Sequence, residues 1–232
     1  ETVNDHAPIK IFPPNQIIGI KHRLNTPSAQ VKSAILLTAL YANSKTVLLP
    51  CSITRNHTEL MLEFLGYPIT HNEKEIIMEH GKLKGLNTIT IPGDFSSAAF
   101  LILASLLAKE SQITIENVGL NPTRIGFLKI LQLMGGKIII KIDQNKSCEP
   151  QGSITVQSSE LFGINVPKNL ITLSIDELPL VFLAAACAKG TTIIRNAKEL
   201  RFKESDRITA MAKMLSELSI DIEEFYDGLT IS

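Results

Sequence analysis

The charged residues best placed to do chemistry lie in the nonapeptide LRFKESDRI, residues 200–208. Within it the cations Lys203 and Arg207 flank the carboxylates of Glu204 and Asp206, between a predicted strand and a predicted helix. A helix that begins here, capped by Asp206 or the serine before it, would turn free amides toward an anion. Arg207 could then grip a carboxylate or phosphate, Lys203 could add a point charge, and Glu204 could move a proton. A capped helix start with an exposed ion pair, worth about 0–1 kcal/mol, explains the charge pattern equally well.

Two other predicted helices begin with polar groups that could bind a ligand. Ser28-Ala29-Gln30 opens an apolar run, and a hydroxyl with an amide at a helix start suits a phosphate or a sugar-like diol. An N-cap role explains Ser28 but not Gln30. Asp176 opens another apolar run, where the helix dipole favours a carboxylate by about 0.3–1 kcal/mol. Ser28 and Asp176 hold near-equivalent positions in an internal repeat, which suggests one cleft in which Asp176 acts as a base toward a hydroxyl.

An arginine also precedes a predicted helix in each copy of that repeat: Arg55, Arg124 and Arg207. One arginine per copy fits either an architectural contact or a shared anion site. Both interpretations stay open for Arg55, whereas for Arg124 the sequence favours an architectural contact.

The repeat that positions these residues has a period of about 70 to 80 residues. Each copy runs from an apolar helix through a β-rich stretch, an arginine-bearing loop and an amphipathic helix to extended segments. The apolar helices are predicted over residues 28–42, 96–109 and 176–190, and the amphipathic helices over 58–66, 124–136 and 206–218. Gly66 and Gly135 fit helix stops. The βαβαββ order predicts an α/β fold with mixed sheets, and a domain boundary that separates residues 1–91 from 92–232.

Composition argues against several classes of function. Lys+Arg and Asp+Glu number 23 each, so bulk charge favours neither nucleic acid nor an acidic membrane as a partner. The 3 cysteines are far apart, and no spacing of Cys and His fits a metal site, which predicts no metal, no disulfide and reduced, cytosolic surroundings. The most apolar run, residues 98–108, is shorter than the roughly 20 residues that cross a bilayer, and predicts a helix buried on every side.

Several motifs together resemble the EPSP synthase family over residues 24–232: SAQVKSAILLTALYA, TRNHTELM, PGDFSSAAFLILA, IDELPLVFLAAACAKGTT and LRFKESDRI. The resemblance implies two domains, each an inside-out α/β barrel of βαβαββ units with buried helices and outer sheets. It also implies that residues 1–91 are the C-terminal part of the first, upper domain and that 92–232 are the larger part of the second, lower domain, so that each domain is incomplete.

The family transfers the enolpyruvyl group of phosphoenolpyruvate to the 5-hydroxyl of shikimate 3-phosphate and releases phosphate, on the pathway to chorismate. The resemblance therefore implies these small-molecule substrates, no cofactor, no metal, and no nucleic-acid or membrane partner. The complete protein is expected to be a cytoplasmic monomer.

In the first domain, the resemblance assigns Ser28, Ala29 and Gln30 to shikimate 3-phosphate, with Gln30 also near phosphoenolpyruvate. Arg55, in the segment RNHT, would help to hold the shikimate substrate. Asn56 is a departure, because the family has an acid at this position.

In the second domain, Asp176 matches the carboxylate that bonds the reacting hydroxyl and takes its proton. Lys203 matches a lysine that binds the shikimate substrate, and Arg207 an arginine that binds phosphoenolpyruvate. Glu204 matches the acid that moves protons at the methylene carbon. The resemblance thus makes Asp176 and Glu204 the catalytic residues.

Some of the family's cationic segments have no counterpart in this sequence: the N-terminal lysine-serine-arginine segment, the glycine-rich loop, and the C-terminal arginine and lysine. Charge-assisted contacts contribute about 1.5–3 kcal/mol each, so we expect the 232-residue chain alone, an internal fragment of the family's fold, to be inactive. Two alternatives stay open. One is the cell-wall enolpyruvyl transferase that acts on UDP-N-acetylglucosamine, against which KESDR and SAQVKSA argue, and the other is a non-catalytic binding module of the same fold.

Overall fold

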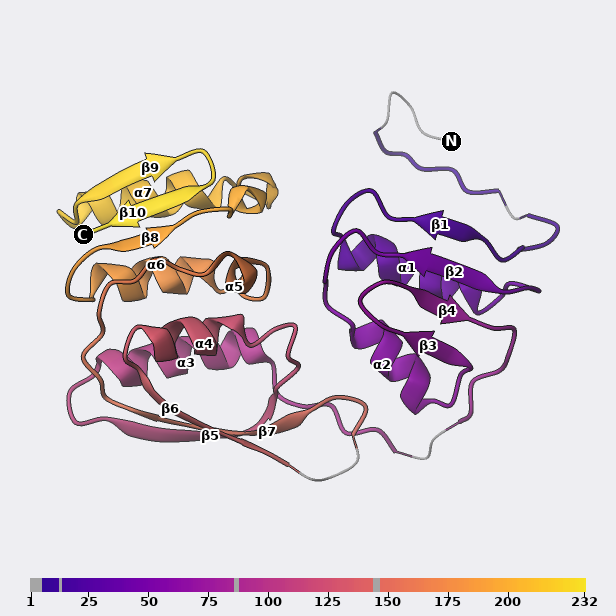
Figure 1. Ribbon diagram of the computed structural model, residues 1–232, viewed down its shortest axis with the longest axis horizontal. Helices are drawn as coiled ribbons and strands as arrows, with labels where there is room; N and C mark the ends of the chain where they lie inside the picture. The colour runs from indigo at the N-terminus through magenta and orange to yellow at the C-terminus, as the bar shows by residue number, and fades with distance from the viewer. Residues whose placement is uncertain (1–5, 13, 86–87, 144–146) are drawn as a thin grey trace. The chain divides into compact units, whose positions relative to one another are not determined.

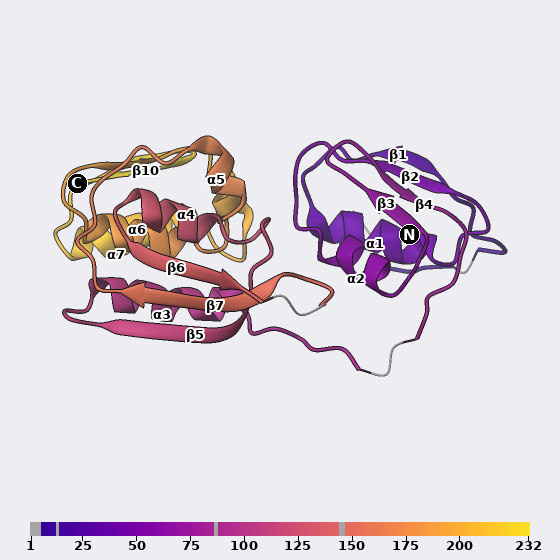
Figure 2. The ribbon, with the colours of Figure 1, turned by 60° about the horizontal axis from the view of Figure 1, so that its bottom comes forward.

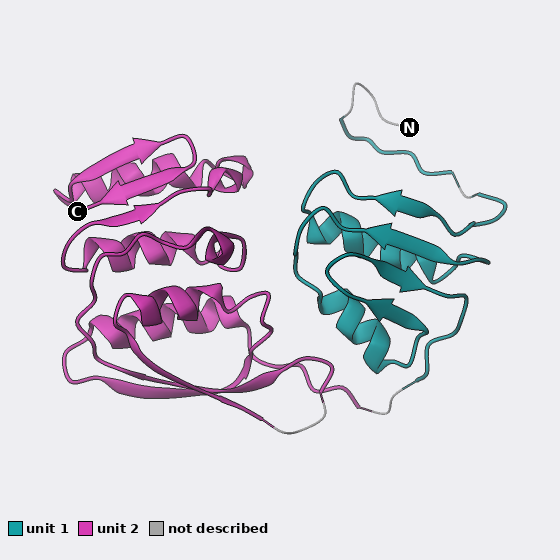
Figure 3. Cartoon of the chain, viewed as in Figure 1, with its two compact units in different colours: residues 1–86 teal, residues 87–232 magenta. Residues whose placement is uncertain are grey.

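The computed structural model describes residues 6–12, 14–85, 88–143 and 147–232. The chain divides into two compact units, Glu1–Leu86 (unit 1) and Asn87–Ser232 (unit 2), coloured teal and magenta in Figure 3. The boundary predicted from the sequence, after residue 91, lies slightly further along the chain. The assignment of the two parts to an upper and a lower domain stays a prediction.

Unit 1 is a mixed sheet with two helices on one face (Figure 2). Its elements are β1 (Lys21–Arg23), α1 (Ala29–Ala39), β2 (Thr46–Leu49), α2 (His57–Phe64), β3 (Ile69–His71) and β4 (Ile76–Met78). The strand order is β1-β2-β4-β3, in which β1 and β2 are parallel and the other neighbours antiparallel. The parallel pair needs a crossover, and α1 supplies it. Apolar residues of both helices and three strands, including Leu36, Leu48 and Leu62, form the core of this unit.

The described residues of unit 2 form two antiparallel sheets and a single hydrophobic core. Its first elements are α3 (Phe95–Leu107), β5 (Gln112–Gly119), α4 (Gly126–Leu133), β6 (Lys137–Ile142) and β7 (Gln151–Gln157). They are followed by α5 (Lys168–Thr172), α6 (Leu178–Ala186), β8 (Thr192–Ile194), the 3-10 helix η1 (Lys198–Phe202), α7 (Arg207–Glu217), β9 (Ile222–Phe225) and β10 (Gly228–Ile231). In Figure 1, α3 and α4 cover one face of the sheet β5-β7-β6, while α6 and α7 cover one face of the sheet β8-β10-β9. The predicted arrangement of buried helices and outer sheets is confirmed in this unit.

The sheets repeat one topology three times. In each copy the second, fourth and third strands lie side by side: β2-β4-β3, β5-β7-β6 and β8-β10-β9. Where unit 1 pairs β1 with β2, the described part of unit 2 has isolated parallel bridges: Gly93 to Val118 in the second copy, and Phe162 to Lys189 and Asn165 to Ile193 in the third. The predicted βαβαββ repeat is therefore confirmed, with the first strand reduced to isolated bridges in the second and third copies.

The backbone after the second helix of the repeat also matches between copies. The amide of Lys84 donates to the carbonyl of Leu65 at 2.7 Å, and the amide of Phe162 donates to the carbonyl of Met134 at 2.8 Å. Both carbonyls belong to the residue that caps the helix, α2 in one copy and α4 in the other. The equivalence of the segments LKG and LFG, residues 83–85 and 161–163, is thus a structural one.

The predicted helix stops at Gly66 and Gly135 are confirmed. Gly66 follows α2 with φ +70°, and Gly135 follows the last residue of α4 and its cap with φ +99°. Both lie in the left-handed region, which glycine enters without the penalty that a Cβ brings. In the third copy Ser219, φ +63°, takes the same place after α7.

The prediction that the helix in residues 98–108 is buried on every side is wrong for the described part of the chain. One side of α3 packs against β5, β7 and α6 and buries Ile102 and Leu103. Phe100 and Leu101, on another side, are 64% and 57% exposed. Apolar residues on every side of a helix favour burial of every side, but they do not ensure that other elements of the same chain cover each one. Across the described residues, no helix is both long and apolar enough to span a membrane.

Candidate functional site

Asp176 is the centre of a charged cluster in unit 2. Its Oδ2 accepts a hydrogen bond from Nη1 of Arg124 at 3.0 Å. Its Oδ1 lies 3.8 Å from Nζ of Lys203 and 4.0 Å from Nη1 of Arg207. The structure thus brings together three residues that the sequence assigned to one site, and adds Arg124, for which the sequence favoured an architectural role.

The position of Asp176 relative to the helix differs from the prediction. Asp176 was expected to open a helix, but α6 begins at Leu178, and Glu177 occupies the N-cap position without a side-chain cap. Pro179 explains this boundary, because proline fits the first turn of a helix, where its missing amide has no partner to lose. Asp176 therefore lies in the turn before α6, where its carboxylate contacts other side chains.

The segment that carries Lys203, Glu204 and Arg207 connects η1 to α7. Asp206 caps α7, because its Oδ1 accepts from the amides of Ile208 and Thr209 at 3.1 Å each. The predicted helix start is therefore confirmed, and of the two proposed caps the aspartate is the one used. Arg207 is the first residue of α7, so its side chain is carried by a fixed helix end.

Arg201 anchors this segment to the rest of unit 2. Its guanidinium donates to Asp206 at 2.6 Å, to Glu224 at 3.0 Å, and to the carbonyls of Phe225 and Tyr226 at 2.7 and 2.6 Å. Burial alone would raise the pKa of Asp206, but hydrogen bonds from Thr209 and Arg201 and the charge of Arg201 hold it below its usual value. The sequence analysis did not single out Arg201, although it is the arginine of the nonapeptide that does the anchoring.

Glu204 forms an ion pair with Arg207, whose Nη2 donates to Oε2 at 2.7 Å. The pKa of Glu204 lies below its usual value, first because of the hydrogen bond from its own backbone amide and then because of Arg207. The carboxylate is therefore ionised at neutral pH, and its lowered pKa makes it a weak base. To act as an acid it must first take up a proton in the same reaction cycle.

In unit 1 the predicted residues Ser28, Ala29 and Gln30 form the start of α1. The Oγ of Ser28 caps the helix by accepting from the amide of Val31 at 3.2 Å. A hydroxyl that accepts one bond can still donate its proton to a ligand. Gln30 is exposed in the first turn, so its amide faces solvent and is accessible to a ligand.

A buried ion pair ties this helix start to the loop of Arg55. Nζ of Lys32 lies 2.6 Å from Oε1 of Glu59, and the two side chains are only 4% and 3% exposed. The same Nζ donates to the backbone carbonyl of Arg55 at 2.7 Å. This pair was not predicted, although the lysine among the apolar residues of SAQVKSAILL was a visible signal in the sequence.

The structure thus gathers the predicted residues into two groups, one in each unit. Unit 1 carries Ser28, Ala29, Gln30 and Arg55, and unit 2 carries Asp176, Lys203, Glu204 and Arg207. Their roles toward a substrate stay predictions. Among the described residues, no group of His, Cys, Asp and Glu side chains is arranged to hold a metal ion.

Comparison with known proteins gives a consistent family. The family model for EPSP synthase (3-phosphoshikimate 1-carboxyvinyltransferase) matches residues 2–232. A 3-phosphoshikimate 1-carboxyvinyltransferase from Vesicomyosocius okutanii is 46% identical over 231 residues, covering 100% of this chain and 53% of the relative. An EPSP synthase structure from Acinetobacter baumannii matches with a TM-score of 0.87 and 41% identity, over 94% of this chain and 49% of that one.

A more distant structure shares the fold alone. The enolpyruvyl transferase NikO from Streptomyces tendae is 16% identical with a TM-score of 0.65, over 94% of this chain and 52% of that one. The chain spans about half the length of the curated relatives it matches, 53% in the two first cases.

Proposed function

This chain belongs to the EPSP synthase family, and on that premise we propose that the whole protein transfers the enolpyruvyl group of phosphoenolpyruvate to the 5-hydroxyl of shikimate 3-phosphate. The observation that carries the proposal is the cluster in unit 2. Asp176 lies within 4.0 Å of both Lys203 and Arg207, and Arg207 pairs with Glu204. This arrangement places a carboxylate that can bond a hydroxyl beside two cations that can bind phosphate or carboxylate groups.

Asp176 is the group that acts on the nucleophile. The 5-hydroxyl oxygen must form a bond to C2 of phosphoenolpyruvate, and it becomes a better nucleophile as its proton moves to a hydrogen-bonded carboxylate. Lys203 binds the anionic shikimate substrate, and Arg207 binds phosphoenolpyruvate. Nζ of Lys203 and Nη1 of Arg207 lie 3.8 and 4.0 Å from Oδ1 of Asp176, so both cations are close to the carboxylate that acts on the hydroxyl.

Glu204 handles the proton on the methylene carbon. Addition of the hydroxyl across the C2–C3 double bond requires a proton at C3, and elimination of phosphate removes a proton from the same carbon. One carboxylate can serve both steps if it takes up a proton before the addition and regains it in the elimination. The lowered pKa of Glu204 disfavours its protonated form, so the first step requires that bound substrate raise this pKa.

Residues of unit 1 complete the binding of shikimate 3-phosphate. Ser28 and Gln30 offer a hydroxyl and an amide at the N-terminus of α1, which attracts anions. Arg55 adds a guanidinium, and its backbone is fixed by Lys32. We also propose that the whole protein works as a cytoplasmic monomer without a metal or another cofactor.

The test is turnover by the whole protein with purified substrates. We expect equal amounts of phosphate and of the enolpyruvyl product of shikimate 3-phosphate, followed by phosphate release and mass spectrometry. Turnover with UDP-N-acetylglucosamine instead would identify the cell-wall reaction, and binding of shikimate 3-phosphate without turnover would identify a binding module. Either result would overturn the proposal. The 232-residue chain by itself is expected to show no turnover, because it spans about half of its relatives.

A further inference from the structure

Arg124 joins the N-terminal ends of three helices in unit 2. It lies in the turn before α4. Its Nη2 donates to Oγ of Ser96, in the first turn of α3, at 2.6 Å, and to Oε1 of Glu177, at the start of α6, at 3.0 Å. Its Nη1 donates to Oδ2 of Asp176 at 3.0 Å. One guanidinium therefore contacts both α3 and the turn that carries the proposed catalytic carboxylate.

The orientation of Arg124 is fixed by a buried carboxylate. The side chain of Glu177 is 2% exposed and that of Arg124 is 12% exposed. A buried charge requires a partner, and Glu177 has two, because Ser96 also donates to its Oε1 at 2.6 Å. The guanidinium is planar and its donors point in set directions, so the bonds from Nη2 to Glu177 and Ser96 also set the direction of Nη1.

The fixed Nη1 in turn determines how the two oxygens of Asp176 are oriented. Oδ2 is held by Arg124, whereas Oδ1 is the oxygen nearest to Lys203 and Arg207, at 3.8 and 4.0 Å. Rotation of the carboxylate would break the bond to Arg124. Oδ1 is thus presented on the side of the two cations proposed to bind the substrates.

We infer that Arg124 is a positioning residue for enolpyruvyl transfer: locked by Glu177 and Ser96, it holds one oxygen of Asp176 so that the other meets the reacting hydroxyl. The inference rests on the proposed function, and it assigns Arg124 no contact with substrate. Arg124→Lys keeps the positive charge but cannot reach Asp176 and Glu177 with a planar fork. It should lower kcat about 10- to 100-fold, as a misplaced reacting group does, with little change in the affinity for shikimate 3-phosphate.

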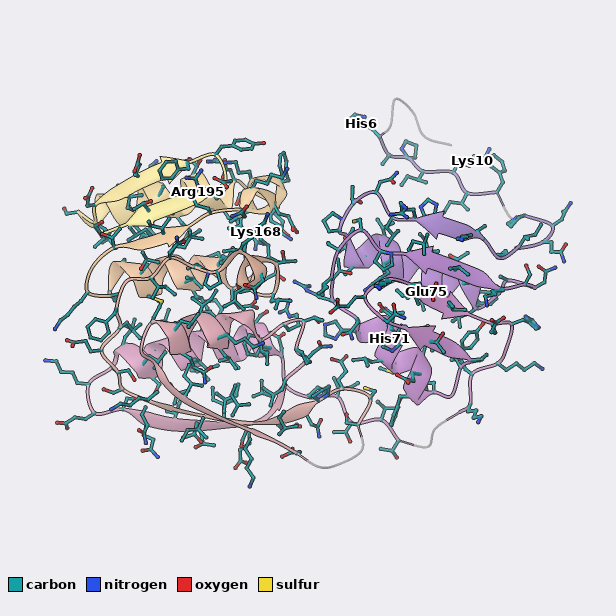
Figure 4. The ribbon with its side chains drawn as sticks, in the orientation of Figure 1. His6, Lys10, His71, Glu75, Lys168 and Arg195 are labelled. Atoms are coloured by element: carbon teal, nitrogen blue, oxygen red, sulfur yellow. The ribbon has the colours of Figure 1, made fainter. Side chains whose placement is uncertain are left out.

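A double-mutant cycle in the whole protein separates positioning from a merely structural role. If Arg124 acts through Asp176, adding Arg124→Lys to Asp176→Ala should lower kcat by less than about twofold, the scatter of additive effects. Losses that multiply in the double variant would overturn the inference. Arg195→Lys is the matched control, since Arg195 directly follows β8 (Figure 4) and pairs with Asp227 instead, and its kcat should equal that of the wild type.

A second variant keeps the test decisive if Arg124→Lys does not fold. Ser96→Ala retains all of the charges and removes only the hydroxyl that bonds Arg124 and Glu177. It should lower kcat when Asp176 is present and leave it unchanged in Asp176→Ala; an equal loss in both backgrounds would overturn the inference. A wild-type protein that shows no turnover would overturn the proposed function and the inference with it. An active wild type with multiplying losses would overturn the inference alone.

Discussion

Replacing Lys32 with methionine should destabilise unit 1 by about 3–5 kcal/mol, because it leaves the charge of Glu59 buried without its partner. Lys32 and Glu59 are 4% and 3% exposed and their charged atoms are 2.6 Å apart. Glu59 has little other support, since its Oε2 is buried and has no hydrogen-bond partner among the residues that the structure describes. A methionine side chain fills a similar volume, so the loss reports the charge and its hydrogen bonds and not a cavity.

Removing both partners should be much less harmful than removing one. Replacing a buried ion pair with apolar residues is often close to neutral, so Lys32→Met combined with Glu59→Met should recover most of the loss. A remainder of about 1–3 kcal/mol is expected, because the carbonyl of Arg55 loses the donor that Lys32 supplies.

Hydrogen exchange of the whole protein, followed by mass spectrometry on peptides from α1 and α2, measures this change where it occurs. Lys45→Met is the matched control, because Lys45 also pairs with a glutamate of unit 1, Glu79, at 2.7 Å, but the two side chains are 50% and 53% exposed. That variant should change stability by less than about 1 kcal/mol. Equal protection in Lys32→Met and Lys45→Met would refute the argument from burial.

Two further predictions concern acid stability and a helix stop. The pKa of Asp227 is held below its usual value, first by the hydrogen bond from the amide of Asn196 and then by Arg195. Its contribution to stability is therefore present above the ordinary pKa of about 3.9 and is lost as the pH falls through the lower folded value. On acidification the urea midpoint of Asp227→Asn should fall less than that of the wild type, and parallel curves would contradict this. Gly66→Ala should lower the free energy of unfolding in urea by about 1–2 kcal/mol, because φ at this position is +70°. Gly85→Ala, whose Cβ would meet nothing within 4 Å, should lower it by less than about 0.5 kcal/mol. Equal losses would contradict the role of the left-handed turn.

The sequence was most informative where a feature repeats or is local. The order of apolar and amphipathic helices identified the repeat, and Gly66 and Gly135 marked two helix ends. Side-chain periodicity and the backbone freedom of glycine both act within a few residues, so both are visible in the sequence. The exposed face of α3 could not be predicted in this way. Phe100 and Leu101 are as apolar as their buried neighbours, and whether they are covered depends on what else packs against that side.

The candidate site shows the same difference between local features and features that depend on packing. Lys203, Glu204 and Arg207 stand within a single nonapeptide, so the chemistry of the segment could be read directly. The bonds that hold Asp176 could not, because Arg124 lies 52 positions before it. Long-range polar networks of this kind depend on how elements pack, and no periodicity encodes which arginine meets which carboxylate.

If residues of both units bind shikimate 3-phosphate, removing a cation from either unit should weaken the binding of this substrate by the whole protein. Arg55→Met in unit 1 and Lys203→Met in unit 2 each remove one cation, and calorimetric titration gives the dissociation constant of each variant. Each variant should bind the substrate about 10- to 150-fold more weakly, the equivalent of one charge-assisted contact, while Lys45→Met should bind it as the wild type does. Wild-type affinity in either Arg55→Met or Lys203→Met would show that the substrate does not contact both units.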